Sequence, residues 1–207
     1  MKLNTKKVSV KISNPELIQK RHNQIFEAAL KLISSKGYDM TTLRELSEES
    51  GIGLGNIYNY IGKKTDILYI LWENLNKIIT EEFTHLAHKN IDPAVKLKKM
   101  IEKELKIISN YEDLVMIIYQ EGHSMGKGSL KSMLSGEEEH VSYYKQALDE
   151  GVKSGVFRRH NTLAMSHLIK SMMDSWILKR WAMRKKVSMN QIKREILNLI
   201  YDGLLNK

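Results

Sequence analysis

The 207-residue sequence contains no cysteine, only two prolines and no long apolar segment. Without cysteine the chain can form neither disulfides nor thiolate metal sites, and this usage is typical of a reducing compartment. Its apolar runs, such as Leu114–Tyr119, are too short to cross a bilayer, and the first ten residues lack the apolar segment of a signal peptide. We therefore expect a cytoplasmic protein with no membrane partner.

What the sequence does contain is positive charge and helical periodicity. Lys and Arg number 33 against 24 Asp and Glu, and the net charge of +9 favours a polyanionic partner without identifying it. Both prolines, Pro15 and Pro93, directly follow an Asn or Asp, a combination found where helices begin. Apolar residues recur at helical spacing along the chain, which predicts an all-α fold.

The stretch 41–64 has the pattern of two short helices joined by a tight turn. Thr42 and Glu45 have the spacing of a capping box, which opens the first helix. Gly51 stands where that helix ends, a position that favours glycine. A second helix is predicted over Leu54–Ile61, and helix, glycine-containing turn and helix together predict a DNA-binding helix-turn-helix.

The second helix and its surroundings carry the side chains that DNA binding requires. Amides such as Asn56 and Asn59 read base edges, whereas hydroxyl and ammonium groups bind phosphates. Leu54 and Gly55 permit close approach to the duplex. The predicted DNA-contacting residues are Thr41, Thr42, Leu54, Gly55, Asn56, Tyr58, Asn59, Tyr60, Lys63 and Lys64.

From Arg21 to Leu68 the sequence resembles the DNA-binding domain of the TetR family of bacterial repressors. The matching positions are Arg21, Ile25, Ala28-Ala29, Gly37-Tyr38, Thr41-Thr42, Leu46-Ser47, Ser50-Gly51, Ile57-Tyr58-Asn59-Tyr60, Lys64 and Leu68. Gly53, Ile61 and Lys63 depart from residues common in the family, without changing the apolar pattern. The resemblance implies a homodimer that binds a palindromic operator, with an effector-binding domain after the helix-turn-helix.

Three regions are predicted. Residues 1–13 form a basic tail, either an arm for the minor groove or a solvated segment with little role. Residues 14–66 form a three-helix DNA-binding domain, and residues 67–207 form a helical domain for effector binding and dimerisation. Its helices are expected over residues 64–89, 93–108, 112–120, 135–152, 162–186 and 189–205, with capping boxes at Ser135 and Ser188.

The C-terminal half is rich in Met and Trp, which suit either an adaptable apolar pocket or an ordinary core. The family resemblance favours a pocket, for which the candidates are Met100, Met116, Tyr119, Tyr144, Met173, Trp176 and Arg180. The last two helices are apolar around much of their circumference, so they need a partner beyond their own domain. The resemblance implies that this partner is the second subunit of a dimer. The interface candidates are Ile192, Ile196, Leu199, Ile200, Gly203 and Leu204.

Two segments, Gly155–Arg158 and Trp176–Trp181, resemble the acyl-coenzyme A-sensing branch of the family. The resemblance implies an acyl thioester as effector. Arg180, Arg184, Lys185 and Lys186 are candidates to meet its phosphates. Equally, these cations could have no ligand and lie at the C-terminal end of a helix only because the helix dipole stabilises positive charge there.

Three alternatives compete with this interpretation. Gly122-His123-Ser124-Met125-Gly126 matches the nucleophile motif of serine hydrolases, although no alternation of strands and helices surrounds it. His85 and His88 lie three residues apart on a predicted helix, a spacing that metal sites use but that solvated helix faces show more often. A DNA-binding architectural protein without an effector is the third. We expect a regulator rather than an enzyme, with no cofactor and no metal.

Overall fold

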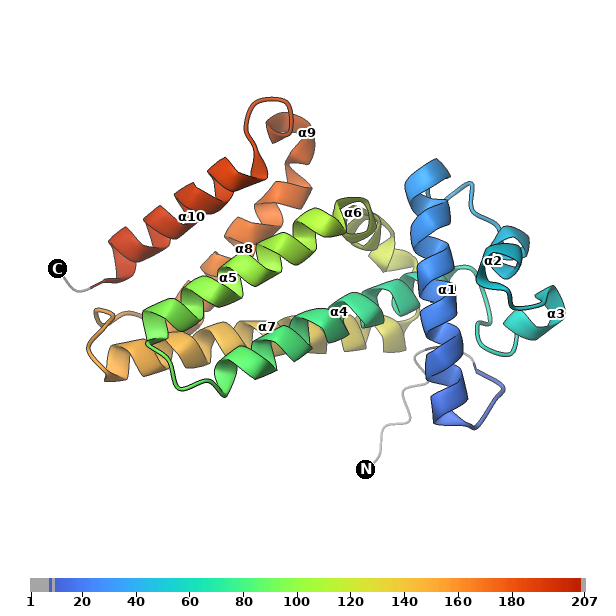
Figure 1. The fold of residues 1–207 in the computed structure, drawn as a ribbon, viewed down its shortest axis with the longest axis horizontal. Helices are drawn as coiled ribbons and strands as arrows, with labels where there is room; N and C mark the ends of the chain where they lie inside the picture. The colour runs from blue at the N-terminus through green and yellow to red at the C-terminus, as the bar shows by residue number, and fades with distance from the viewer. Residues whose placement is uncertain (1–7, 9, 206–207) are drawn as a thin grey trace. The chain divides into compact units, whose positions relative to one another are not determined.

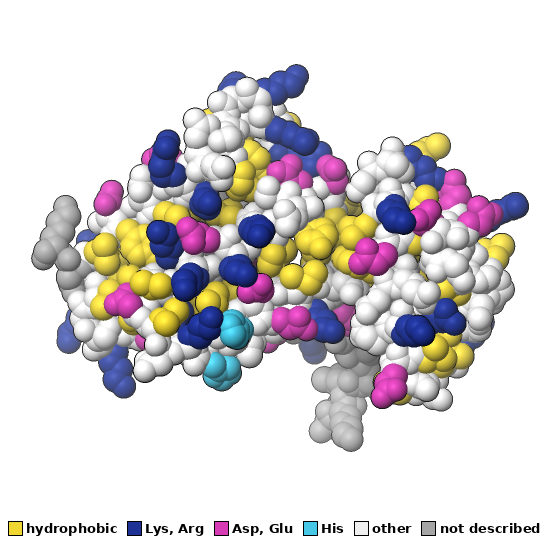
Figure 2. Space-filling view, in the orientation of Figure 1, with side chains coloured by type: hydrophobic (Ala, Val, Ile, Leu, Met, Phe, Trp, Pro, Cys, Tyr) yellow, Lys and Arg dark blue, Asp and Glu magenta, His cyan; other side chains and the backbone are white. Residues whose placement is uncertain are grey.

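A computed structural model describes residue 8 and residues 10–205, and its regular structure in that range is helical (Figure 1). The helices form two compact units, which are considered separately. The first unit comprises the described residues up to Lys77 together with Asp113–Ser135, and the second comprises Ile78–Glu112 and the described residues from Gly136. On the face shown in Figure 2, Lys and Arg side chains are interspersed with Asp and Glu.

The first unit contains three N-terminal helices and parts of four further elements. They are α1 (Pro15–Lys36), α2 (Leu43–Ser50), α3 (Leu54–Ile57), the beginning of α4 (Thr65–Ala87), α6 (Glu112–Glu121), a 3-10 turn (Gly122–Ser124) and the beginning of α7 (Lys127–Lys153). α1 packs against α2, and α2 against α3 (Figure 1). Their shared core is aliphatic and fully buried; its members include Ile25, Ala29, Leu46, Ile52, Ile57, Ile61 and Leu68.

The second unit contains the rest of α4 and α7 together with four helices of its own. These are α5 (Pro93–Asn110), α8 (Thr162–Leu178), the short α9 (Arg180–Met183) and α10 (Met189–Leu204). α5, α8 and α10 pack against one another (Figure 1). Among the helices described, none combines the length and apolarity needed to span a membrane.

Local capping signals in the sequence locate most helix ends correctly. The Asn14 side chain accepts a hydrogen bond from the Leu17 amide at 3.1 Å and opens α1. Asp92 opens α5 in the same way, and Ser188 with Gln191 forms the predicted capping box of α10. Gly51 ends α2 with φ of 67°, in the left-handed region that glycine enters without strain.

Three predicted boundaries were wrong. α7 begins at Lys127, so Ser135 lies inside a helix and the Ser135–Glu138 spacing is not a cap. The helix predicted over residues 162–186 is interrupted at Lys179, whose ψ of 14° separates α8 from α9. α3 is shorter than predicted and ends at Ile57, after which turn hydrogen bonds carry the chain to Ile61.

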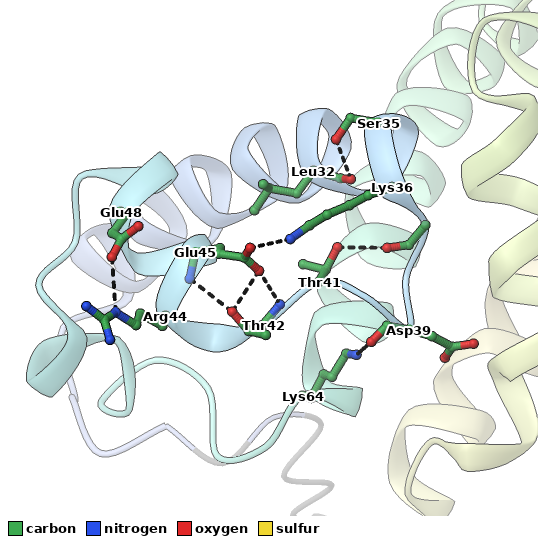
Figure 3. A network of polar contacts seen from close by, with 11 residues as sticks. Leu32, Ser35, Lys36, Asp39, Thr41, Thr42, Arg44, Glu45, Glu48 and Lys64 are labelled. Carbon is green, nitrogen blue, oxygen red and sulfur yellow. Dashed lines mark hydrogen bonds and ion pairs between the residues drawn. The ribbon is translucent and has the colours of Figure 1, made fainter.

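The capping box of α2 continues into an ion pair that joins α2 to α1 (Figure 3). The Glu45 carboxylate accepts hydrogen bonds from the amide and hydroxyl of Thr42 at 3.0 and 2.7 Å. It also lies 2.5 Å from the Lys36 ammonium. Lys36 first, and the Thr42 donors after it, lower the pKa of Glu45 to about 2. The cap is therefore tied to the end of the neighbouring helix.

We predict that this carboxylate makes the stability of the protein depend on pH. Because the pKa of Glu45 is lower in the folded state than its ordinary value of 4.5, its stabilisation is present above about pH 4.5 and is lost as the pH falls through about 2. Glu45→Gln keeps a capping side chain but loses the charge. The melting temperatures of the two proteins should differ at pH 5 and converge towards pH 2. A Glu45 pKa near 4.5 by NMR titration would contradict the ion pair.

Close packing at the end of α7 depends on the absence of a side chain at Gly151. A Cβ at this position would lie 2.9 Å from Cγ of Phe157, and closer still to other atoms of the ring. Phe157 is buried, its amide donates to the Gly151 carbonyl at 3.0 Å, and the Arg158 amide donates to Leu204 at 2.9 Å. The ring has no room to withdraw.

We predict that Gly151→Ala destabilises the protein by about 2 kcal/mol or more, the cost of overpacking a buried site. Gly203→Ala is the matched control, since nothing lies within 4 Å of a Cβ at Gly203 in α10. That change should be neutral or stabilise the fold by about 0.5–1 kcal/mol. Urea unfolding of the three proteins measures both effects, and equal stabilities for Gly151→Ala and wild type would refute the packing argument.

Candidate nucleic-acid interface

A short network of hydrogen bonds fixes the turn between α2 and α3. The Ser47 hydroxyl donates to the Ile52 carbonyl at 2.6 Å, and the Ile52 amide donates to the Ser47 carbonyl at 3.2 Å. Ser50 donates to the Ser47 carbonyl as well. Since Ser47, Ser50 and Ile52 are buried, these bonds are shielded from water. The turn therefore holds α3 at a fixed angle to α2.

α3 and the turn after it have one buried and one exposed side. Ile57 and Ile61 are completely buried. Leu54, Gly55, Asn56 and Tyr58 are exposed, and Tyr58 keeps 42% of its surface accessible. Buried isoleucines thus anchor the segment while its polar groups face outward, which is the arrangement that reading a DNA groove requires.

The two asparagines are joined to each other. The Asn59 side-chain amide donates to the Asn56 side-chain oxygen at 2.8 Å, and Asn59 is half-buried. The Asn56 amide group remains exposed. The hydrogen bond from Asn59 therefore already orients the Asn56 side chain in the protein without DNA.

Two of the predicted phosphate contacts were wrong, because their side chains are buried. Tyr60 is only 3% exposed, and its carbonyl lies 3.0 Å from Nε2 of the buried His22 on α1. Thr41 is 1% exposed, and its hydroxyl donates to the Gly37 carbonyl at 2.8 Å (Figure 3). Both residues brace the domain. The neighbouring Thr42 is exposed.

Two lysines follow the turn after α3 and differ in their surroundings. Lys63 is exposed, whereas Lys64 is half-buried and lies over the Tyr38 ring. The Lys64 ammonium donates to the Asp39 carbonyl at 2.8 Å (Figure 3). An ammonium has three donors, so this bond leaves others for a phosphate. Asp66 accepts from the amides of Gly62 and Lys63 and fixes the start of α4.

The structure attaches Lys11, from the predicted basic tail, to this surface and adds Arg44, which the sequence did not single out. The Lys11 amide donates to the Asn59 carbonyl at 2.9 Å, which attaches the segment before α1 to the end of the recognition turn. Arg44 is exposed in the first turn of α2 and pairs with Glu48 at 3.3 Å (Figure 3). The Lys11 bond joins residues far apart in sequence. The predictions for residues 1–7 and 9 of the tail lie outside the described residues.

The residues predicted to form an effector pocket are distributed over both units. Met116 and Tyr119 lie on α6 in the first unit, and Tyr119 is exposed. Met100, Tyr144, Met173 and Trp176 are buried in the second unit, where α9 carries the half-buried Arg180. The structure therefore does not bring all seven residues together within one compact unit.

One buried member of this set, Tyr144, contacts a charged cluster in the second unit. Tyr144 donates to the fully buried Glu104 at 2.7 Å, and the Lys170 ammonium lies 3.0 Å from Glu104 and 2.7 Å from Asp174. Burial alone would raise the pKa of Glu104, but Lys170 and its other partners outweigh burial and lower it. For Asp174 burial prevails and the pKa rises. The core of this unit is therefore polar at its centre.

The predicted dimer interface was wrong in part. Ile196, Ile200 and Leu204 are buried within the protomer, so they have almost no surface to offer a partner. Leu199 is 68% exposed, and Ile192 and Gly203 are half-buried. One face of α10 thus belongs to the protomer core, and an adjoining face carries an exposed leucine. The apolar side chains Ile196, Ile200 and Leu204, which the sequence pattern assigned to the dimer interface, instead pack inside the protomer.

The serine-hydrolase motif is not a nucleophile elbow. Ser124 follows α6 in a 3-10 turn, and its hydroxyl donates to the Glu121 carbonyl at 2.7 Å. A nucleophile elbow follows a strand of a sheet, and here a helix precedes the serine. Over the described ranges, His, Asp and Glu form no group of three or more placed to hold a metal ion.

Comparison with known proteins agrees with the geometry of the N-terminal helices. The model of the bacterial regulatory proteins of the TetR family matches residues 25–69, and that of the tetracycline repressor-like C-terminal domain matches residues 90–204. The transcriptional regulator HbdR of Aromatoleum sp. (strain CIB) is 24% identical over 194 residues, covering 94% of this chain and 85% of HbdR. The fatty acid metabolism regulator of Bacillus subtilis (strain 168) is 22% identical, covering 90% of this chain and 97% of that protein.

A solved structure shares the same fold. The crystal structure of AibR in complex with isovaleryl coenzyme A and operator DNA superposes with a TM-score of 0.69 at 16% identity, covering 88% of this chain and 99% of AibR. The family models together match well over half of the sequence, and the helix-turn-helix lies inside the first match. This protein belongs to the TetR family of bacterial transcriptional regulators.

Proposed function

We propose that the protein represses transcription by inserting α3 into the major groove of a palindromic operator, and that it acts by binding rather than by catalysis. The observation that carries this proposal is the two-sided burial of Leu54–Ile61. Ile57 and Ile61 are buried, whereas Leu54, Asn56 and Tyr58 face outward. Action on an operator places the protein with the chromosome in the cytoplasm.

The exposed residues divide into readers of bases and binders of phosphate. Asn56, oriented by Asn59, presents an amide that can make paired hydrogen bonds to adenine. Leu54 and Gly55 let the helix approach the bases. Tyr58, Lys63 and Lys64 have donors for phosphates, and Lys11 and Arg44 extend the cationic surface. Thr42 is also exposed, but its amide and hydroxyl already donate to Glu45, so it would have to exchange that partner for a phosphate.

The protein is proposed to bind its operator as a homodimer formed through the C-terminal helices. Large apolar side chains are exposed there: Leu163, Leu168 and Leu178 on α8, Trp181 on α9 and Leu199 on α10. Trp181 is 78% exposed, and burying this apolar side chain against a second copy of the chain would lower the free energy of the protein. A two-fold axis would set two α3 helices about 34 Å apart, one turn of DNA.

An apolar effector, with an acyl coenzyme A as the leading candidate, is proposed to release the operator. AibR carries isovaleryl coenzyme A in its solved structure, and a relative regulates fatty acid metabolism. α4 contributes residues to both compact units and begins next to Lys64. A shift of this helix would move α3 and change the spacing of the two recognition helices. Effector and operator must then weaken each other's binding by the same factor.

Two substitutions test the division between base readers and phosphate binders. Asn56→Ala should weaken operator binding by about 1–3 kcal/mol and leave binding to a random duplex unchanged. Lys63→Ala should weaken binding to both duplexes and flatten the log–log salt dependence by about 0.9 for each phosphate that is no longer neutralised. Fluorescence anisotropy with labelled duplexes over a range of salt concentrations measures both effects. Equal weakening on both duplexes for Asn56→Ala would show that this residue does not read bases.

A charge on the exposed face of α10 tests the dimer. Leu199→Asp should yield a monomer in sedimentation at micromolar concentration, because a carboxylate would be buried without a partner. Operator affinity should fall by about a hundredfold or more once bivalent binding is abolished. Leu134→Asp on α7 is the control, since Leu134 is also exposed but belongs to the first unit. A dimeric Leu199→Asp protein with full operator affinity would place the interface elsewhere.

A further inference from the structure

An open groove of about 1010 Å³ lies within the second unit. Its walls are the last turns of α4, one face of α5 and the beginning of α10. Lys and Arg side chains gather over α4 and α5 on the face shown in Figure 2, with apolar atoms between them. None of the residues predicted for the effector pocket lines this groove. It is therefore a separate feature of the second unit.

The groove combines an apolar base with a cationic rim. Leu86 of α4 and Leu105 of α5 are buried beneath it, and Ile78 and Met189 are half-buried beside them. Five lysines lie around these apolar side chains: Lys89, Lys99, Lys103, Lys106 and Lys193. A ligand held here would meet apolar surface and positive charge together.

Most of this positive charge is not compensated. Lys103 pairs with Glu82 at 2.9 Å. The other four lysines make no ion pair or side-chain hydrogen bond with any residue that the structure describes. Lys99, Lys103 and Lys106 follow one another on the same face of α5, where like charges three and four residues apart repel. A bound anion would relieve that repulsion.

The remaining polar groups define where an anion would lie. Ser109 and Asn110 at the end of α5 and Asn190 at the start of α10 add uncharged donors beside the lysines. Of the groove's three acids, Glu81 and Glu82 are on α4 and Glu102 is on α5. Lysines still outnumber acids on the α5 and α10 walls, so anionic groups are best accommodated there, with the α4 side left for hydroxyl or amino groups.

We propose that this groove binds an organic ligand that carries at least two phosphate groups, held by Lys99, Lys106 and Lys193. The volume is at the upper end of small-molecule sites, about 300–1,000 Å³, so a bare phosphate ion would leave it mostly unfilled. Coenzyme A thioesters and nucleoside polyphosphates share the required chemistry. This inference rests on the proposed function in one respect: it takes the ligand of the groove to be the effector that releases the operator.

The test is titration calorimetry on the full-length protein without DNA, using coenzyme A, decanoyl coenzyme A, ATP and inorganic pyrophosphate separately. The double variant Lys99→Ala/Lys106→Ala should bind the phosphate-bearing ligand at least about tenfold more weakly, the effect expected for two exposed charged groups. Lys98→Ala is the matched control, because Lys98 is an exposed neighbour on α5 that does not line the groove. It should bind like the wild type.

Every outcome of the titrations either supports or overturns phosphate binding in the groove. Binding of coenzyme A compounds alone, or of ATP as well, supports the groove and identifies which source of phosphate it accepts, provided that the double variant is impaired. No binding by any of the four compounds, binding by pyrophosphate alone, equal affinity in the double variant, or an equal weakening in Lys98→Ala overturns the proposal.

Operator release, measured by anisotropy with the same compounds, separates this inference from the proposed function. If a ligand releases the operator but binds the double variant as tightly as the wild type, the groove is refuted and the effector-controlled repressor remains. If the double variant no longer binds the ligand but no ligand alters operator affinity in the wild type, the groove remains and effector control through it is refuted.

Discussion

The DNA-binding surface depends on the buried turn between α2 and α3. Ser47 and Ile52 hold each other through two hydrogen bonds, and Gly51 supplies the left-handed residue that the turn requires. Because Ile52, Ile57 and Ile61 are then buried in the core of the first unit, the polar side of the segment faces solvent. A side chain such as Asn56 is thus positioned by residues that never touch DNA.

The second unit uses its polar groups differently. Glu104, Lys170 and Asp174 lie inside it, and separating them would leave a buried charge without a partner. The lysines of the groove lie on the surface instead, and most of them have no acidic partner. The buried cluster fixes α5, α7 and α8 to one another through Glu104, Tyr144 and Lys170. The unpaired surface cations play no such internal role. Their clustering is therefore better suited to an external anion than to holding the fold.

The failed predictions share a physical cause. Thr41 and Tyr60 have hydroxyl groups of the kind that bind phosphate, but both residues are buried. Tyr60 lies against His22 of α1, which is 38 positions away in the sequence, and the Thr41 hydroxyl donates to Gly37 at the end of α1. The stripe Ile196–Leu204 has the periodicity of an interface, and periodicity does not distinguish a partner subunit from the protomer's own core. The capping spacing of Ser135 occurs within α7, where the backbone amides already have helical partners.

The sequence alone determined the all-α class, the helix-turn-helix and many helix ends, because caps such as Asn14, Thr42 with Glu45, and Ser188 with Gln191 act over three or four residues. The spacing of Ile57 and Ile61 also predicted correctly that Tyr58, which lies between them, is exposed. Only the tertiary structure decided which hydroxyls are buried, that Lys11 lies against Asn59, and that lysines of α5, of α10 and of the segment after α4 border one groove. The Lys11–Asn59 bond joins residues 48 positions apart, and the groove joins α5 to α10, so the packing of separate segments and not local pattern brings these residues together.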